Sequence, residues 1–121
     1  MTQLENSFLI NLLKILPEEV DCFIQAPSLD NEVIQAMFQK TKFDYFNLIC
    51  LNEISKGKFL EQELKTSFSI YIQNIEIMKN GHLLFKGYDG VEYGIISKEI
   101  PIPKWFKEKY IPDTCLISSE W

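Results

Sequence analysis

The hydrophobic spacing of this chain changes near Ser67, and that change limits the folds that the chain can adopt. Before Ser67, large apolar side chains recur every three or four residues, as they do on the buried face of a helix. After Ser67 they alternate, as they do along a strand with one buried face. The alternating residues are Phe68, Ile70 and Ile72, followed after a change of phase by Ile75 and Ile77. The sequence therefore predicts a helical first half and a strand-rich second half, with a β-bulge near Asn74.

Two short turns divide the second half into strands. Asn80-Gly81 and Asp89-Gly90 are residue pairs that a type I′ hairpin turn prefers, because both of its central residues need a positive φ. The first long strand therefore leads through these turns to strands at residues 83–86 and 91–98. Pro103 favours a short helix over residues 104–110, and residues 115–118 add a fourth strand.

The first half contains two helical segments by pattern. Residues 4–16 carry apolar side chains at helical spacing, and Pro17 ends this segment because the residue before a proline avoids helical angles. A second helix is expected over residues 30–40, with Asp30 as its N-cap and Glu32 at the positive end of its dipole.

Residues 43–54 fit both a helix and a strand, and the helix is the preferred interpretation. Gly57 interrupts the pattern, and residues 59–65 add one or two helical turns.

The chain has 121 residues, of which 46% are hydrophobic, enough to bury one core. We therefore expect a single α+β domain over residues 1–121, with N-terminal helices packed on a C-terminal antiparallel β-meander of three to four strands.

Neither a targeting segment nor a membrane span is evident in the sequence. No apolar run is long enough to cross a bilayer, and the N-terminus lacks the basic start of a secretory signal. A cytoplasmic location is therefore expected. Cys22, Cys50 and Cys115 are scattered and odd in number, which favours buried free thiols over a disulfide framework or a zinc site.

The composition of charged residues is unusual, because the chain has twelve lysines, no arginine and seventeen acidic residues, for a net charge of -5. Arginine is the side chain that binds phosphates with a planar fork of donors. A chain without it, and with an acidic balance, is poorly equipped to bind nucleic acid. This composition instead favours a basic protein as the partner.

No arrangement of residues in the sequence predicts catalysis, a cofactor or a metal. The single histidine, His82, follows a predicted turn, and no serine or cysteine lies in a nucleophile motif. The five glycines form no phosphate-binding loop, and no acidic loop of calcium-binding form occurs. An enzyme that uses paired carboxylates remains a less favoured alternative, and it would need two close acids in unlike environments.

The acidic residues of the first half are the main candidates for partner binding. No lysine lies between Ile15 and Gln39, and residues 1–50 contain seven acidic residues and three lysines, a net charge of -4. The candidates are Glu18, Glu19, Asp21, Asp30 and Glu32. They suit a docking face for a basic protein, because complementary charge speeds encounter and selects partners. The alternative is that they are ordinary solvated residues at helix starts.

A second group combines aromatic and acidic side chains near the third predicted strand. Its members are Tyr88, Asp89, Glu92 and Trp105. Tyrosine and tryptophan anchors with carboxylate neighbours are typical of interface hot spots. Burial in the core is the alternative for the aromatic residues.

The chain resembles the small immunity proteins of contact-dependent growth inhibition and related polymorphic toxin systems of bacteria. The resemblance lies in its length, its acidity, its lack of catalytic motifs and the segment Gly81-His82-Leu83-Leu84-Phe85-Lys86-Gly87-Tyr88-Asp89-Gly90. It covers no family motif residue by residue, so no functional residue is carried over. The resemblance implies a compact cytoplasmic protein that binds and blocks a cognate toxin domain, such as a basic nuclease. The alternative is a regulatory or adaptor domain that binds another cellular protein or a small ligand.

Overall fold

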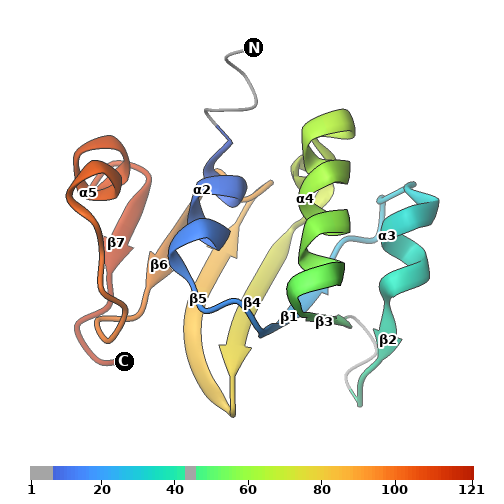
Figure 1. The fold of residues 1–121 in the computed structure, drawn as a ribbon, viewed down its shortest axis with the longest axis horizontal. Coiled ribbons are helices and arrows are strands. Elements are labelled where there is room, and N and C mark those ends of the chain that lie inside the picture. The colour runs from blue at the N-terminus through green and yellow to red at the C-terminus, as the bar shows by residue number, and fades with distance from the viewer. Residues whose placement is uncertain (1–6, 43–45) are drawn as a thin grey trace.

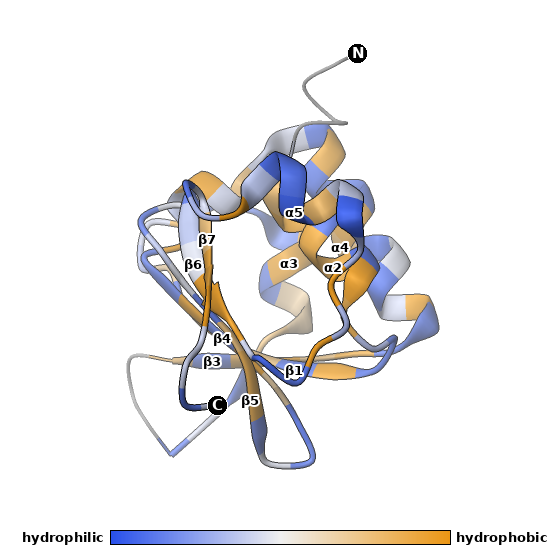
Figure 2. Cartoon of the chain, turned by 90° about the vertical axis from the view of Figure 1, so that its left-hand side faces the viewer, coloured by the Kyte–Doolittle hydropathy of each residue, from blue (hydrophilic) through white to orange (hydrophobic). Residues whose placement is uncertain are grey.

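In a computed structural model, which describes residues 7–42 and 46–121, four α-helices lie on one face of a seven-stranded sheet (Figures 1 and 2). The helices are α2 (Phe8–Ile15), α3 (Glu32–Met37), α4 (Glu53–Thr66) and α5 (Lys104–Tyr110), with a 3-10 turn η1 (Phe68–Tyr71) after α4. The strands are β1 (Val20–Gln25), β2 (Gln39–Lys40), β3 (Asn47–Leu51), β4 (Asn74–Lys79), β5 (His82–Tyr88), β6 (Tyr93–Ile96) and β7 (Cys115–Ile117). Their order across the sheet is β2-β3-β1-β4-β5-β6-β7, and only β6 and β7 run parallel.

The fold is α+β, but the predicted arrangement of N-terminal helices on a C-terminal meander of three to four strands is wrong. Helices are interspersed with strands along the chain, and the first half supplies three strands of one mixed sheet. β1 lies inside the sheet, between β3 and β4. Its residues Val20, Cys22 and Ile24 are buried and the residues between them are half-buried. This alternation was present in the sequence, but it is short and adjoins a run of acidic residues that obscured it.

The helix preferred for residues 43–54 is also wrong, although residues 43–45 lie outside the described part of the chain. Asn47–Leu51 is a strand that pairs with β1, and the pairing decides between two conformations that the local sequence fits equally well. Helix α4 then begins at Glu53, because the Asn52 side chain accepts hydrogen bonds from the backbone N–H groups of Ile54 and Ser55. It continues through Gly57, where a break was expected.

Several local predictions are confirmed. α2 occupies the described part of the helix expected over residues 4–16, and α5 coincides with the helix expected over residues 104–110. Both residue pairs have the expected positive φ angles, 51° and 80° at Asn80 and Gly81, and 51° and 77° at Asp89 and Gly90. Only Asn80-Gly81 is a two-residue hairpin turn, because residues 89–92 form a four-residue loop and β6 begins at Tyr93 instead of at residue 91. The β-bulge lies between Ile77 and Met78 and not near Asn74. The change of hydrophobic phase near Asn74 instead marks the passage from the 3-10 turn η1 to strand β4, so the strand expected to start at Phe68 starts at Asn74.

Aromatic rings connect the helices to the sheet. The Phe8 ring on α2 lies 5.8 Å from Phe85 of β5, 6.0 Å from Phe106 and 4.8 Å from Tyr110 of α5, between centroids. These contacts place α2 and α5 on the same face of the sheet. The longest described helix, α4, has 14 residues, and within the described ranges no helix is long and apolar enough to cross a bilayer.

A pair of glycines lets the Phe85 ring lie flat on the sheet. Gly87 of β5 and Gly94 of β6 are direct cross-strand neighbours. A Cβ atom at Gly94 would overlap the Phe85 ring and the backbone oxygen of Lys86, and a Cβ at Gly87 would lie 2.7 Å from the same ring. The missing side chains therefore create the space that this core aromatic residue fills.

A buried carboxylate joins three elements beside this core. Glu63 of α4 is only 4% exposed. Its Oε2 accepts hydrogen bonds from the hydroxyls of Ser69 (2.7 Å) and Ser7 (3.1 Å), and its Oε1 accepts one from the Ser69 backbone N–H (3.1 Å). Three donors compensate for the loss of water around the buried group, so Glu63 holds α4, η1 and the start of α2 together.

We predict that Gly94→Ala lowers the free energy of unfolding by about 1–3 kcal/mol, because the new methyl group displaces the Phe85 ring. Gly57→Ala is the matched control, since a Cβ at this exposed helix position meets nothing within 4 Å. It should raise the free energy of unfolding by about 0.5–1 kcal/mol. Urea denaturation of both variants measures the two changes, and equal stability of the two variants would contradict the packing described for Phe85.

Candidate binding site

Figure 2 shows the helices on one side of the sheet, which leaves the opposite face uncovered by them. The alternate side chains of each strand lie on that opposite face. On β1 and β4 these are the half-buried Asp21, Phe23, Glu76 and Met78, which alternate with the buried residues of the core. Lys86 and Tyr88 of β5 and Tyr93 and Ile95 of β6 continue the same surface through cross-strand pairing. We call this surface the open face.

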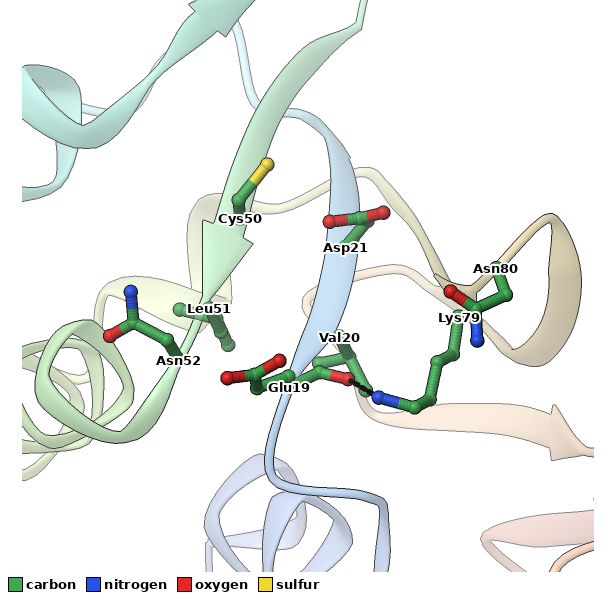
Figure 3. Close-up of a pocket in the computed structure, with 8 residues that line it drawn as sticks. All are labelled: Glu19, Val20, Asp21, Cys50, Leu51, Asn52, Lys79 and Asn80. Atoms are coloured by element: carbon green, nitrogen blue, oxygen red, sulfur yellow. Dashed lines mark hydrogen bonds between the residues drawn. The ribbon is translucent and has the colours of Figure 1, made fainter.

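At one end of the sheet, the start of β1 and the ends of β3 and β4 surround a hollow of about 310 Å³ (Figure 3). Its lining consists of Glu19, Val20, Asp21, Cys50, Leu51, Asn52, Lys79 and Asn80. Strand register explains the arrangement, because Asp21 lies directly opposite Cys50 on one side and Met78 on the other. We call this the acidic hollow.

Two carboxylates and one cation give the acidic hollow its electrostatic character. In Figure 3 the Asp21 carboxylate and the Cys50 thiol lie on neighbouring strands, and the Glu19 carboxylate is turned toward the end of β3. Lys79 is the one cation of the lining, and its Nζ donates a hydrogen bond of 2.9 Å to the backbone oxygen of Glu19. The lysine is therefore bound to the wall of the hollow, while both carboxylates face its space.

The fold also brings a second lysine to the acidic run. Lys56, in the first turns of α4, interacts electrostatically with the exposed Glu18. Partial burial lowers the pKa of Lys56, and the Glu18 carboxylate opposes that shift. The lysine-free window of the sequence is therefore partly compensated in space by Lys56 and Lys79, which come from distant elements.

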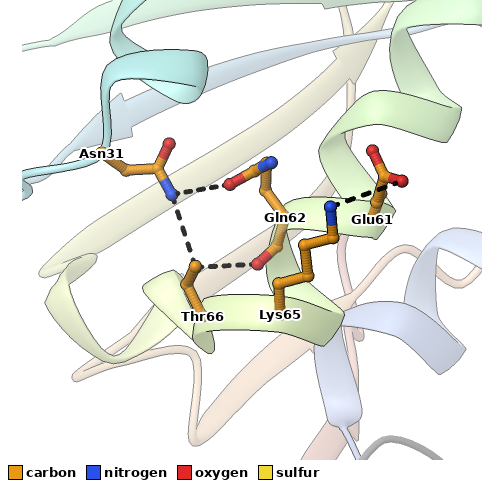
Figure 4. A network of polar contacts seen from close by, with 5 residues as sticks. All are labelled: Asn31, Glu61, Gln62, Lys65 and Thr66. Atoms are coloured by element: carbon orange, nitrogen blue, oxygen red, sulfur yellow. Dashed lines mark hydrogen bonds and ion pairs between the residues drawn. The ribbon is translucent and has the colours of Figure 1, made fainter.

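Asp30 and Glu32 lie away from the acidic hollow. Asn31, between them, caps α3, and its amide nitrogen donates to Gln62 Oε1 (3.1 Å) and Thr66 Oγ1 (3.4 Å) at the end of α4 (Figure 4). The hollow instead adjoins the start of α4 through Asn52. Because α4 is about 20 Å long at 1.5 Å per residue, the five acidic candidates form two separate groups rather than one face.

The aromatic candidates are also divided. Tyr88, Asp89 and Glu92 lie together at the turn between β5 and β6, where the Tyr88 ring stacks on the Tyr93 ring with centroids 5.6 Å apart. The Tyr93 hydroxyl donates a hydrogen bond of 3.0 Å to Asp89 Oδ2. Trp105 lies on α5, beyond the opposite face of the sheet, with its ring against Phe106. It is therefore not part of this turn surface.

Sequence reasoning missed the partners of these candidates. Cys50 and Lys79 line the hollow only because their strands pair with β1, and no local sequence pattern predicts that pairing. Tyr93 was missed because a two-residue turn at Asp89-Gly90 would pair Tyr88 with Val91, whereas the loop has four residues and pairs Tyr88 with Tyr93. His82 is exposed and lines a different hollow with Trp121, beside the start of β5 and the end of β6.

The acidic hollow offers groups that can bind a cation or an ammonium or guanidinium group. Among the described residues, no three or more histidine, cysteine, aspartate or glutamate side chains are grouped so that they could hold a metal ion. Cys50 is exposed, contrary to the buried thiol expected from the sequence. Partial loss of water is the largest cause that raises the pKa of its thiol, and the Asp21 carboxylate raises it further through a hydrogen bond and by charge repulsion. The thiol is thus protonated at neutral pH and a weak nucleophile.

Comparison of the chain with protein-family models, with curated proteins and with solved structures gives no match.

We predict that Asp21→Asn speeds alkylation of Cys50 by iodoacetamide severalfold at pH 8. A neutral amide no longer disfavours the thiolate, so the pKa of Cys50 falls and the reactive fraction rises. Cys22 and Cys115 are buried and serve as internal controls that stay unmodified in the folded protein. Mass spectrometry of the peptide that contains Cys50 gives the rate. A rate that does not change in the variant would place Asp21 away from the thiol.

Proposed function

We propose that this protein binds a basic protein partner and performs no reaction itself. The observation that carries this proposal is the acidic hollow, where the Glu19 and Asp21 carboxylates face open space at the end of the sheet. A lysine or arginine side chain of a partner would enter the hollow and bind both carboxylates by charge-assisted hydrogen bonds.

The remaining groups of the hollow support this role. Lys79 is bound to a backbone oxygen, so its position does not block the centre of the hollow. The Asn80 amide adds a neutral group that can accept a further N–H donor, whereas the Asn52 amide oxygen is already occupied by the cap of α4. The net charge of -5 acts over a longer range, because it attracts a basic protein and raises the rate of encounter.

The role that fits this binding best is that of an immunity protein in a bacterial toxin system. The partner would be a basic toxin domain, for example a nuclease, whose substrate-binding face is positive because it binds phosphates. An acidic protein that covers this face would exclude the nucleic acid. Both molecules would meet in the cytoplasm. This assignment rests on the resemblance in length, acidity and missing catalytic motifs, together with the acidic hollow.

Co-expression tests the assignment directly. An immunity gene lies directly downstream of its toxin gene, so the probe is the C-terminal domain of the protein encoded immediately upstream. We expect that this domain stops growth when it is expressed alone, that this chain restores growth, and that the two co-elute from a size-exclusion column. Growth arrest that persists beside folded, soluble chain would contradict the immunity role. A stable complex with a non-toxic upstream product would favour the regulatory alternative.

We predict that the double variant Glu19→Lys and Asp21→Lys slows association with this basic partner by about tenfold or more at low salt, because a rim of like charge repels it. The matched control is Glu61→Lys with Glu108→Lys, which changes the net charge equally but on exposed helix positions. Stopped-flow association rates at several salt concentrations separate the two. Equal slowing in both variants would show that net charge alone matters and would remove the hollow from the interface.

A further inference from the structure

The end of the sheet opposite the acidic hollow carries an exposed patch of a different chemistry. Loop 89–92 packs against η1, because the Gly90 backbone N–H donates a 2.7 Å hydrogen bond to the Ile72 oxygen. A Cβ at Gly90 would lie 3.2 Å from the Ile70 oxygen, which shows how closely the two backbones approach. The loop, η1 and the adjoining ends of β5 and β6 place Ile70, Tyr71, the half-buried Tyr88, Asp89, Glu92 and Tyr93 at this end of the sheet, and we call these residues the tyrosine patch.

The tyrosine patch contains large apolar and aromatic side chains that are exposed to solvent. Ile70, Tyr71 and Tyr93 are 63%, 46% and 47% exposed. Ile70 and Tyr71 are neighbours in η1, whereas Tyr93 is the first residue of β6. Exposed apolar side chains that gather at one end of a sheet are typical of interaction sites in soluble proteins. Asp89, Gly90 and Val91 all have positive φ angles, at 51°, 77° and 56°, and Val91 is buried. The buried Val91 side chain and the hydrogen bond from Gly90 to Ile72 anchor the loop to the rest of the fold.

The charge of the patch is one-sided. Asp89 and Glu92 are exposed, and among the described residues neither forms an ion pair with a lysine. Lys86, the nearest lysine on the same strand, lies directly opposite Glu76 across β4 and β5. The two carboxylates at the turn, Asp89 and Glu92, therefore remain available to a cation.

The geometry of the two tyrosines suits a flat cation. Their rings stack with an interplanar angle of 29°, and the Tyr93 hydroxyl is fixed by its hydrogen bond to Asp89. That hydrogen bond is the main cause that raises the pKa of Tyr93, so the phenol stays protonated as a donor at neutral pH. A guanidinium group can stack on a tyrosine ring and at the same time donate a fork of hydrogen bonds to a carboxylate. An ammonium group has no planar surface, so it cannot stack on the ring while it donates a fork of hydrogen bonds to the carboxylate.

We propose that the tyrosine patch is an arginine-binding site, which receives an arginine side chain of the basic protein partner. Tyr88 and Tyr93 supply the stacking surface, Asp89 and Glu92 accept the N–H donors, and Ile70 and Tyr71 pack against the aliphatic part of the side chain. This inference rests on the proposed function for the identity of the partner, but arginine binding by the patch is measurable without that partner.

The test is an NMR titration of the ¹⁵N-labelled full chain with N-acetylarginine amide. We expect saturable amide shifts at residues 70–71 and 88–93. N-acetylcitrulline amide, which has the same shape without the charge, should cause no shifts there. N-acetyllysine amide should bind about threefold or more weakly, because its ammonium group lacks the planar fork. Equal binding of citrulline or lysine amide, or shifts confined to the acidic hollow, would overturn the proposal.

Substitutions identify the contacts. Asp89→Asn and Tyr93→Ala should each weaken arginine binding about fivefold or more, because each removes one partner of the guanidinium group. Tyr93→Phe keeps the ring and loses the hydroxyl, so it should bind more tightly than Tyr93→Ala. Glu61→Gln on α4 removes an equal charge elsewhere and should change nothing. Unchanged spectra of β4 and β5 establish that each variant is folded. If Asp89→Asn and Glu61→Gln have the same effect, the patch is not the site.

Different results would contradict arginine binding by the tyrosine patch and the proposed binding of a basic protein. Loss of arginine-amide binding in Asp89→Asn with unchanged partner association would leave the acidic hollow as the docking site and would end the role of the patch in the interface. Normal arginine-amide binding by a chain that associates with no basic protein would contradict the proposed function instead.

Discussion

The insertion of β1 between β3 and β4 is the constraint on which the rest of this structure depends. Cys22 and Ile24 are fully buried, and each backbone edge of β1 is paired with a strand that lies far from it in the sequence. The same alternation that buries these two residues turns Asp21 to the other face of the sheet. One strand therefore fixes both the centre of the core and the position of the acidic hollow.

The difference between local and long-range signals explains what the sequence could predict. The Asn80-Gly81 hairpin turn, α2 and α5 depend on neighbouring residues, so they were predictable from glycine positions, proline positions and helical spacing. β1 and β3 depend on each other, and the helix preferred for residues 43–54 failed because a short apolar segment takes the conformation that its partner strand imposes. α4 extends through Gly57 because the Asn52 cap and the buried Phe59 outweigh the small penalty of one helical glycine.

The same distinction applies to the candidate site. Tyr88, Asp89 and Glu92 are close in the chain, so the sequence could identify them as a group. Cys50 and Lys79 are close to Asp21 only through strand register, and Lys56 reaches Glu18 only through the packing of α4. A lysine-free window in the sequence is for this reason a poor measure of surface charge. The structure divides the acidic residues into groups and places lysines beside some of them.

The acidic hollow and the tyrosine patch lie at opposite ends of the open face. β4, with six residues, separates them by about 17 Å at 3.3 Å per residue. A standard protein interface buries about 800 Å² on each partner, which is wide enough to include both. One basic protein lying across the open face would thus contact carboxylates at one end and aromatic rings at the other. The helices on the opposite face would support the sheet without contacting the partner.

Hydroxyl-radical footprinting of the complex with the basic partner tests this account most directly, because it reports the side chains that the partner covers. Met78 and Tyr93 represent the open face, and Trp105, which is 45% exposed on α5, represents the helical face. The account predicts that oxidation of Met78 and Tyr93 falls on binding while oxidation of Trp105 is unchanged. Protection of Trp105 with continued oxidation of Met78 and Tyr93 would place the partner on the helices and contradict it.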